Sequence, residues 1–187
     1  DYVPFPGRSN LDLVGIDNFR GGYVVTDHLL SQGARRVDFL ARPYSAYTIS
    51  LRQRGYKAAL LDHGVVPKEE WIHWGDPESQ DWVNRKLIGK GVTDLVCGND
   101  ETAASLMHTL DSMSVSIPEH FRLVGFDDVR YAKLLRVPLT SLHQPVEEMG
   151  NVAAETMLWR IAHPESPGRH IVISGHLVVR RSSDPRA

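Results

Sequence analysis

Cysteine is almost absent from this sequence, which holds one, Cys97. A single cysteine cannot form an intrachain disulfide, so a disulfide-stapled scaffold is excluded, and a lone thiol suits a reducing compartment. No apolar run approaches the roughly 18 residues that a membrane-spanning helix requires, and no signal peptide opens the chain. We therefore expect a cytoplasmic protein with no membrane partner.

An excess of one charge is also lacking. The sequence has 21 Lys and Arg against 23 Asp and Glu, a formal net charge of −2. A chain with this charge balance lacks the overall excess of positive charge that favours binding to nucleic acid. The 187 residues, 42% of them hydrophobic, are enough for one good core or two small lobes.

Recognisable catalytic and metal-binding motifs are missing as well. The sequence has no G-x-S-x-G elbow, no phosphate-binding loop and no G-x-G-x-x-G fingerprint. Its nine histidines are scattered, without the spacing of zinc ligands. We expect no catalytic residue, no metal site and no cofactor.

Alternating strand and helix patterns run along the whole chain. The expected strands are short apolar runs at residues 13–16, 37–40, 95–98, 123–126 and 140–143, a short edge strand at 71–74, and two runs around Gly175 within 170–181. The expected helices lie at residues 21–32, 52–63, 79–89, 100–110 and 146–161. This alternation predicts a parallel sheet with helices on both faces. The polar residues 180–186 predict a frayed end.

Acidic and amide side chains follow three of the expected strands. They are Asp17 and Asn18, then Asn99 and Asp100, and finally Asp127 and Asp128. Open α/β sheets hold ligands beyond the carboxyl ends of their strands, so these pairs predict a polar site at one sheet edge. For Asp127 we favour ligand contact over a structural role in a turn. Either Asn99 or Asp100 would cap the helix that follows. For Asp100 we favour this N-cap role over ligand contact, and for Asp128 we favour a solvated loop acid.

A further candidate lies between the second expected strand and the next helix. The expected loop 41–50 contains Arg42, Tyr44, Tyr47, Thr48 and Ser50. Loops at strand ends often carry binding residues. Its tyrosines would either stack on a flat ligand or simply pack over the crevice, and the sequence leaves both roles open.

Six stretches of the sequence resemble the sensor domain of the LacI/GalR (lactose-repressor) family of bacterial transcription regulators. They are VGIDN at 14–18 with DHLLSQG at 27–33, RQRGYKAAL at 52–60, CGND at 97–100, LVGFDDV at 123–129, PLTSLHQP at 138–145 leading into MG at 149–150, and LVVRRSS at 177–183. They occur in the family's order and cover essentially the whole chain.

The resemblance implies an α/β, periplasmic-binding-protein-like fold with doubly wound parallel sheets in two lobes. Residues 34–142 and 170–181 would form the C-terminal lobe, and residues 1–33 and 144–165 an incomplete N-terminal lobe. The apolar stripes of helices 21–32 and 146–161 would then cover the sheet of that incomplete lobe. The family's helix-turn-helix is absent from this chain, so operator DNA would be contacted only through a missing N-terminal domain.

The resemblance also implies a small polar effector, by expectation a sugar, bound between the lobes. The ligand-binding residues it suggests, together with Tyr47 from the expected loop, are Arg20, Tyr47, Ser50, Asn99, Asp127 and Gln144, with Asn18 as the alternative to Arg20. Ser50 stands where the family often has an arginine, and Arg52 follows two residues later. The family's homodimer contact would include Ala104, Met107 and Leu135.

Two other classes of protein remain open. The same architecture serves periplasmic sugar-binding proteins, and the same sensor could be joined to a winged-helix DNA-binding domain. The segment encoded upstream of Asp1, whether a helix-turn-helix, a signal peptide or a winged helix, would separate them.

Overall fold

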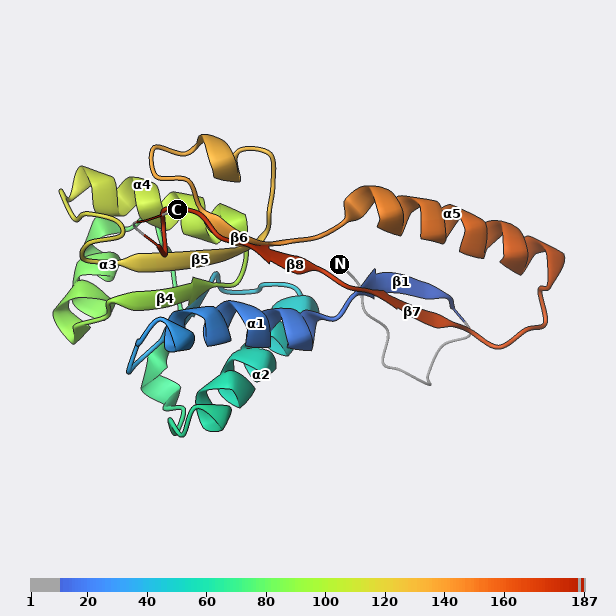
Figure 1. Ribbon diagram of the computed structural model, residues 1–187, viewed down its shortest axis with the longest axis horizontal. Coiled ribbons are helices and arrows are strands. Elements are labelled where there is room, and N and C mark those ends of the chain that lie inside the picture. The colour runs from blue at the N-terminus through green and yellow to red at the C-terminus, as the bar shows by residue number, and fades with distance from the viewer. Residues whose placement is uncertain (1–10, 185, 187) are drawn as a thin grey trace.

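The computed structural model describes residues 11–184 and 186, and its two parts are built on separate sheets (Figure 1). The strands are β1 (Leu13–Ile16), β2 (Asp38–Ala41), β3 (Ile72–Trp74), β4 (Asp94–Cys97), β5 (Arg122–Asp127), β6 (Thr140–His143), β7 (His170–Ile173) and β8 (His176–Val178). The helices are α1 (Asn18–Ser31), α2 (Tyr47–Asp62), α3 (Gln80–Lys86), α4 (Asp100–Ser112) and α5 (Val146–Ala162). Short 3-10 helices are η1 (Glu69–Trp71), η2 (Ile88–Lys90) and η3 (Ala132–Leu134).

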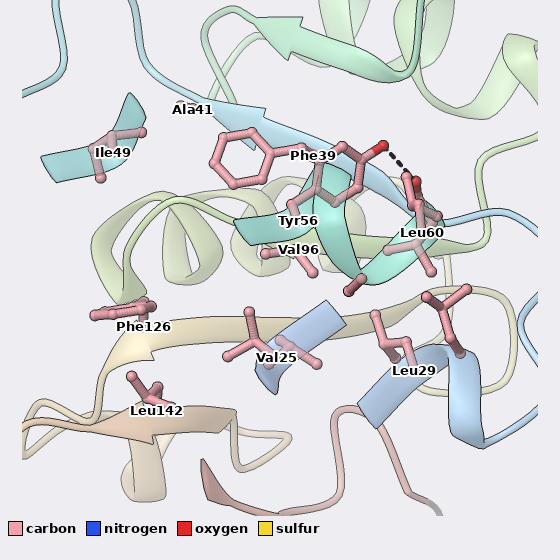
Figure 2. Close-up of a cluster of buried hydrophobic side chains, with 14 of the residues drawn as sticks. Val25, Leu29, Phe39, Ala41, Ile49, Tyr56, Leu60, Val96, Phe126 and Leu142 are labelled. Carbon is pink, nitrogen blue, oxygen red and sulfur yellow. Dashed lines mark hydrogen bonds between the residues drawn. The ribbon is translucent and has the colours of Figure 1, made fainter. Parts of the chain in front are cut away.

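The larger part is a six-stranded sheet in the order β3-β2-β4-β5-β6-β8, parallel except for the antiparallel edge strand β8. Helices α1 and α2 cover one face, where Val25, Leu29, Phe39 and Tyr56 form a buried cluster (Figure 2). Helices α3 and α4 cover the other face over a second buried cluster. The expected doubly wound α/β fold is confirmed.

The smaller part consists of β1 paired in parallel with β7, and helix α5 lies along β1 (Figure 1). Asp12 joins its elements, because its carboxylate accepts hydrogen bonds from Arg160 at the end of α5 and from the backbone N–H of Arg169 before β7. Much of α5 is exposed, including Val146, Leu158 and Ile161. Among the described residues, no helix has the length and apolar content to cross a bilayer.

Helix α1 belongs to the larger part, which corrects the expected lobe boundary at residue 33. Val25 and Leu29 of α1 are completely buried in the cluster with Phe39 and Phe126. The chain therefore passes into the larger part directly after β1. The apolar stripe of this helix covers the six-stranded sheet and not the smaller one.

The C-terminal segment differs from the expectation in two ways. The two strand runs around Gly175 pair with different sheets, because β7 joins β1 and β8 joins β6. The expected fraying is also wrong for the residues after β8, since the side chains of Ser182 and Ser183 are fully buried. Ser182 Oγ accepts a hydrogen bond from the backbone N–H of Thr140 and donates one to the carbonyl of Leu123. Buried backbone groups need such partners, which explains why these polar residues lie inside.

Candidate ligand-binding cleft

A cavity of about 410 Å³ lies where the two parts of the protein meet. Its walls come from β1 and the start of α1, from the first turns of α2, from the β6–α5 connection and from β7. The lining residues are 13–19, Thr48, Leu51, Arg52, Gln144, Met149, His170 and Val172. The volume lies within the range of small-molecule sites, and its position next to the carboxyl end of β6 is where α/β folds hold ligands.

Arg52 is the central charged group of this cavity, although its side chain is almost entirely buried. Its Nε donates to Asn18 Oδ1 at 2.9 Å, and its Nη1 donates to the carbonyl of Gly98 at 2.7 Å. The guanidinium also lies 3.5 Å from the centre of the Phe126 ring, a cation–π contact. These contacts hold the guanidinium in one orientation at the cavity wall.

Asp127 compensates the charge of Arg52. Its Oδ1 lies 3.4 Å from Arg52 Nη1, and the same oxygen accepts a hydrogen bond from the side-chain amide of Gln144. Burial lowers the pKa of Arg52 to about 10, while the nearby Asp127 carboxylate opposes that shift. Burial likewise raises the pKa of Asp127, and Arg52 opposes it. The pair thus gives the cleft a fixed dipole with no net charge.

The backbone at Asp127 is strained, because its φ is 118°, and Asp128 follows with φ 52°. Residues with side chains rarely adopt positive φ, and such positions persist only where surrounding contacts enforce them. Here Asp128 is fixed by an ion pair with Arg180 at 2.7 Å and by a hydrogen bond with His143 Nδ1 at 3.0 Å. Asp128 is therefore a structural anchor for the segment after β8 and not the solvated loop acid that we expected.

Asn99 and Asp100 divide their roles differently from the expectation. Asn99, and not Asp100, caps α4, since its Oδ1 accepts from the backbone N–H of Thr102 at 3.0 Å. Asp100 is fully buried and accepts hydrogen bonds from Ser141 Oγ at 2.6 Å and from the backbone N–H of Val129 at 2.9 Å. Burial raises the pKa of Asp100 to about 6. Its carboxylate fastens the loop after β5 to α4 and β6.

Thr48 brings an unused hydroxyl to the cavity. The residue lies in the first turn of α2, is buried, and its Oγ1 has no hydrogen-bond partner among the described residues. A buried hydroxyl without a partner costs free energy that a ligand hydroxyl could recover. Because Oγ1 itself is shielded from solvent, a ligand would bond to it only after the Thr48 side chain rotates toward the cavity.

The six residues predicted to bind ligand lie at different distances from the cavity. Gln144 lines it, and Asp127 contacts both Gln144 and Arg52. Asn99 has its side-chain oxygen occupied by the cap of α4. Tyr47 and Ser50 belong to α2 and not to a loop, and neither is a lining residue of this cavity. Arg20 lines a separate hollow of about 30 Å³ beside Asp17 and Gly175.

Arg52 was missed as a ligand residue, although the sequence carried a signal for it. It stands four residues before Tyr56, whose aromatic ring is buried against the sheet. Residues four apart on a helix share a face, so Arg52 had to point inward. A buried arginine needs a buried carboxylate, and Asp127 supplies it.

The residues predicted for a dimer contact do lie together. Ala104, Met107 and Leu135 line one surface hollow of about 170 Å³, formed by α4 and the segment after η3. An ion pair between Asp111 and Arg136 lies at its border.

A family model for the periplasmic-binding-protein-like domain matches residues 26–183. The chain belongs to this family. The repressor PurR of Photorhabdus laumondii is 31% identical over 180 residues, which are 94% of this chain and 53% of that protein. The regulator GalR of Escherichia coli K12 is 30% identical over 181 residues, which are 95% of this chain and 52% of that protein. The chain thus spans about half the length of these curated relatives.

Solved structures of this family agree with the observed fold. A LacI family transcriptional regulator from Enterococcus faecium with bound ribose has 28% identity and a TM-score of 0.82, covering 93% of this chain and 66% of that one. The complex of the regulator CelR with cellobiose has 29% identity and a TM-score of 0.84, covering 96% of this chain and 57% of that one. The resemblance to LacI/GalR regulators expected from the sequence is confirmed.

Proposed function

We propose that this chain is the effector-binding part of a bacterial transcription regulator, and that its cleft binds a neutral polyhydroxylated molecule such as a sugar. Support comes from the regulators that the chain matches along nearly its whole length and from the ribose and cellobiose bound by two of them. DNA contact would belong to a segment outside the residues described, and the site of action would be the cytoplasm.

The observation that carries the proposed ligand class is the compensated Arg52–Asp127 pair at the cavity wall, with the unpartnered Thr48 hydroxyl one helical turn from Arg52. An ion pair without net charge repels neither anions nor cations strongly, and it offers a ligand both hydrogen-bond donors and hydrogen-bond acceptors. Arg52 has five N–H donors, and its Nη2 group has no hydrogen-bond partner among the described residues. Together with the amide of Gln144, these groups fit the alternating hydroxyls of a polyol.

A ligand in this cavity would touch both parts of the protein at once. His170 and Val172 belong to the two-stranded sheet, whereas Thr48 and Arg52 belong to the larger part. Binding would therefore favour the relative arrangement of the two parts that has the higher affinity for the ligand. The size of this shift would depend on how much the affinities of the arrangements differ. That shift is the physical route by which an effector would alter DNA binding. No catalytic step is assigned.

A periplasmic-type sugar-binding protein is the alternative function with the same architecture. The relatives named above are transcription regulators, which favours the first assignment. The gene segment upstream of Asp1 separates the two, because the regulator requires a DNA-binding domain there and the transport protein a signal peptide.

Ribose, galactose and cellobiose should be screened for thermal stabilisation of the 187-residue protein. A ligand present at 100 times its dissociation constant adds about 2.7 kcal/mol, which raises the Tm of a protein of this size by about 5–10 °C. Thr48→Val should then weaken the stabilising sugar roughly 3- to 10-fold through one lost hydrogen bond. The same change should raise the unfolding free energy of the free protein, because a methyl group removes the cost of burying a hydroxyl without a partner.

Thr48→Ser is the matched control, since it retains the hydroxyl and should keep most of the affinity. Equal affinity in the wild type and Thr48→Val would remove this residue from the site. No stabilisation by any neutral sugar, together with stabilisation by a charged metabolite, would contradict the proposed ligand class.

We extend the proposal to a homodimer that forms through the hollow lined by Ala104, Met107 and Leu135. Ala104 is small enough for close approach of two helices, and the other two residues are apolar. Light scattering at micromolar concentration should give the mass of a dimer, and Leu135→Lys should give that of a monomer. Leu61→Lys, an exposed position on α2, is the control that should stay dimeric. A wild-type monomer would refute the contact.

A further inference from the structure

A second cavity, of about 540 Å³, lies along the outer edge of the six-stranded sheet. Its lining comes from the edge strand β3, from Trp82 and Lys86 of α3, from Lys90 of η2 and from Arg36 before β2. None of these residues lines the cleft between the two parts. The proposed effector therefore does not account for this cavity.

The floor of this cavity is held by a buried charge network. Asp38 is completely buried and accepts hydrogen bonds from Arg36 Nε at 2.6 Å, from Arg36 Nη2 at 2.7 Å and from His73 Nε2 at 2.7 Å. Arg36 Nη1 donates to the carbonyl of Lys90 at 2.9 Å. Three of the five N–H donors of Arg36 are thus bonded to fixed partners, and two remain for a ligand.

Aromatic side chains form the walls. Trp74 is 45% exposed although it lies in a strand. Trp82 packs edge-on against His73, with ring centres 6.3 Å apart, and a Cβ placed on Gly75 would lie 2.1 Å from the Trp82 ring. The indole of Trp82 is therefore fixed against the backbone, while Trp74 offers an open surface on which a flat ring could stack.

The outer edge of β3 is itself polar. Only β2 pairs with β3 among the described residues, and the backbone N–H of Gly75 bonds toward β2 at Ala41. Because backbone groups alternate sides along a strand, the N–H and C=O of Trp74 point away from β2 and toward the open edge. They add one donor and one acceptor next to the exposed indole.

The mouth of the cavity carries unpaired positive charge. Neither Lys86 nor Lys90 has an ion-pair partner in the part of the chain that the structure describes. Asp38 neutralises Arg36, so the charges that remain among the described lining residues are Lys86 and Lys90 against the carboxylate of Glu70. An anionic ligand would therefore meet a net positive rim, which attracts it from solution.

We propose that this cavity is a second small-molecule site, which binds an anion carrying a planar aromatic ring. The ring stacks on Trp74 at the open edge of the sheet, and the anionic group lies between Lys86, Lys90 and the two remaining N–H groups of Arg36. Phosphate and carboxylate anions both fit this chemistry, so a nucleotide and an aromatic acid are the two sources to compare. The site works independently of the effector cleft.

Isothermal titration of the intact protein with adenosine monophosphate, 1-naphthoate, adenosine and inorganic phosphate tests this site. We expect at least one of the two aromatic anions to bind, and to bind at least about tenfold more tightly than either adenosine or phosphate, because each of these offers only half of the contacts. The aromatic anion that binds more tightly shows whether the site prefers a nucleotide or an aromatic acid. Its affinity should fall as salt is raised, since the lysines are exposed.

Replacing both lysines, as Lys86→Gln with Lys90→Gln, should weaken that anion at least about tenfold, and Trp74→Leu should weaken it by a similar factor. Lys133→Gln, an exposed lysine on η3, is the matched control and should change nothing. Thr48→Val should also leave this binding intact, which separates the site from the cleft. Absence of binding by either aromatic anion at millimolar concentration, or equal binding by the double-lysine variant, would overturn the proposal.

Discussion

Replacing Arg52 with methionine is expected to lower the unfolding free energy by about 3–5 kcal/mol and to abolish effector binding in the cleft. Methionine fills much of the space but cannot donate hydrogen bonds. The change leaves the partly buried carboxylate of Asp127 without its counter-charge, and the carbonyl of Gly98 loses its side-chain partner. Urea unfolding followed by circular dichroism measures the loss.

Arg54→Met is the control on the same helix, since Arg54 is exposed and should change stability by no more than about 0.5 kcal/mol. Adding Asp127→Asn to Arg52→Met should recover part of the stability, because it removes the uncompensated charge. Additive effects of the two changes would show that the ion pair contributes nothing of its own. The single variant Arg52→Lys should be little more stable than Arg52→Met, because a lysine ammonium cannot bond to all of the partners that the guanidinium binds.

Replacing Gly55 with alanine is expected to have the second large effect, a loss of at least about 2–3 kcal/mol. A Cβ at Gly55 would lie 1.9 Å from the carbonyl oxygen of Phe19, and a Cβ at Gly22 would lie 2.0 Å from the carbonyl oxygen of Arg52. The backbones of α1 and α2 therefore approach each other too closely for any side chain. Both helices would have to move apart, which would also shift Arg52 at the cleft.

Gly150→Ala provides the matched comparison for this change. Gly150 lies inside α5, and nothing lies within 4 Å of a Cβ placed there. Alanine favours a helix over glycine by about 1 kcal/mol, so this variant should be as stable as the wild type or more stable. Thermal unfolding compares the two variants directly. Equal stability of Gly55→Ala and Gly150→Ala would show that the helices are not held at this contact.

The architecture of the larger part was predictable because its strands are short apolar runs that end in polar residues. Those runs identified β2, β4, β5 and β6 to within one or two residues. The partner of α1 was not predictable in the same way. An apolar stripe requires a sheet to cover but does not say which sheet, and the glycine contacts with α2 join residues far apart in the sequence.

The cleft was only partly predictable for a related reason. Asp127 was predicted from its place at the end of a strand, and Gln144 was suggested by the family resemblance. Arg52 is buried because a carboxylate from β5 lies beside it, and that neighbour exists only after folding. In the same way, Ser182 is buried because backbone groups of β5 and β6 need its hydroxyl. Residue polarity alone therefore indicated exposure where folding creates buried partners.

The pairing of β1 with β7 has a consequence for the order in which the protein assembles. Leu13 pairs with His170, so this sheet joins nearly the two ends of the described chain. Closing so long a loop in an unfolded chain is entropically costly for the few hydrogen bonds gained. Once the large sheet has formed, α1 and β8 already lie beside each other, and each continues within a few residues into β1 or β7. We therefore expect the smaller sheet to form last, on a template supplied by the larger part.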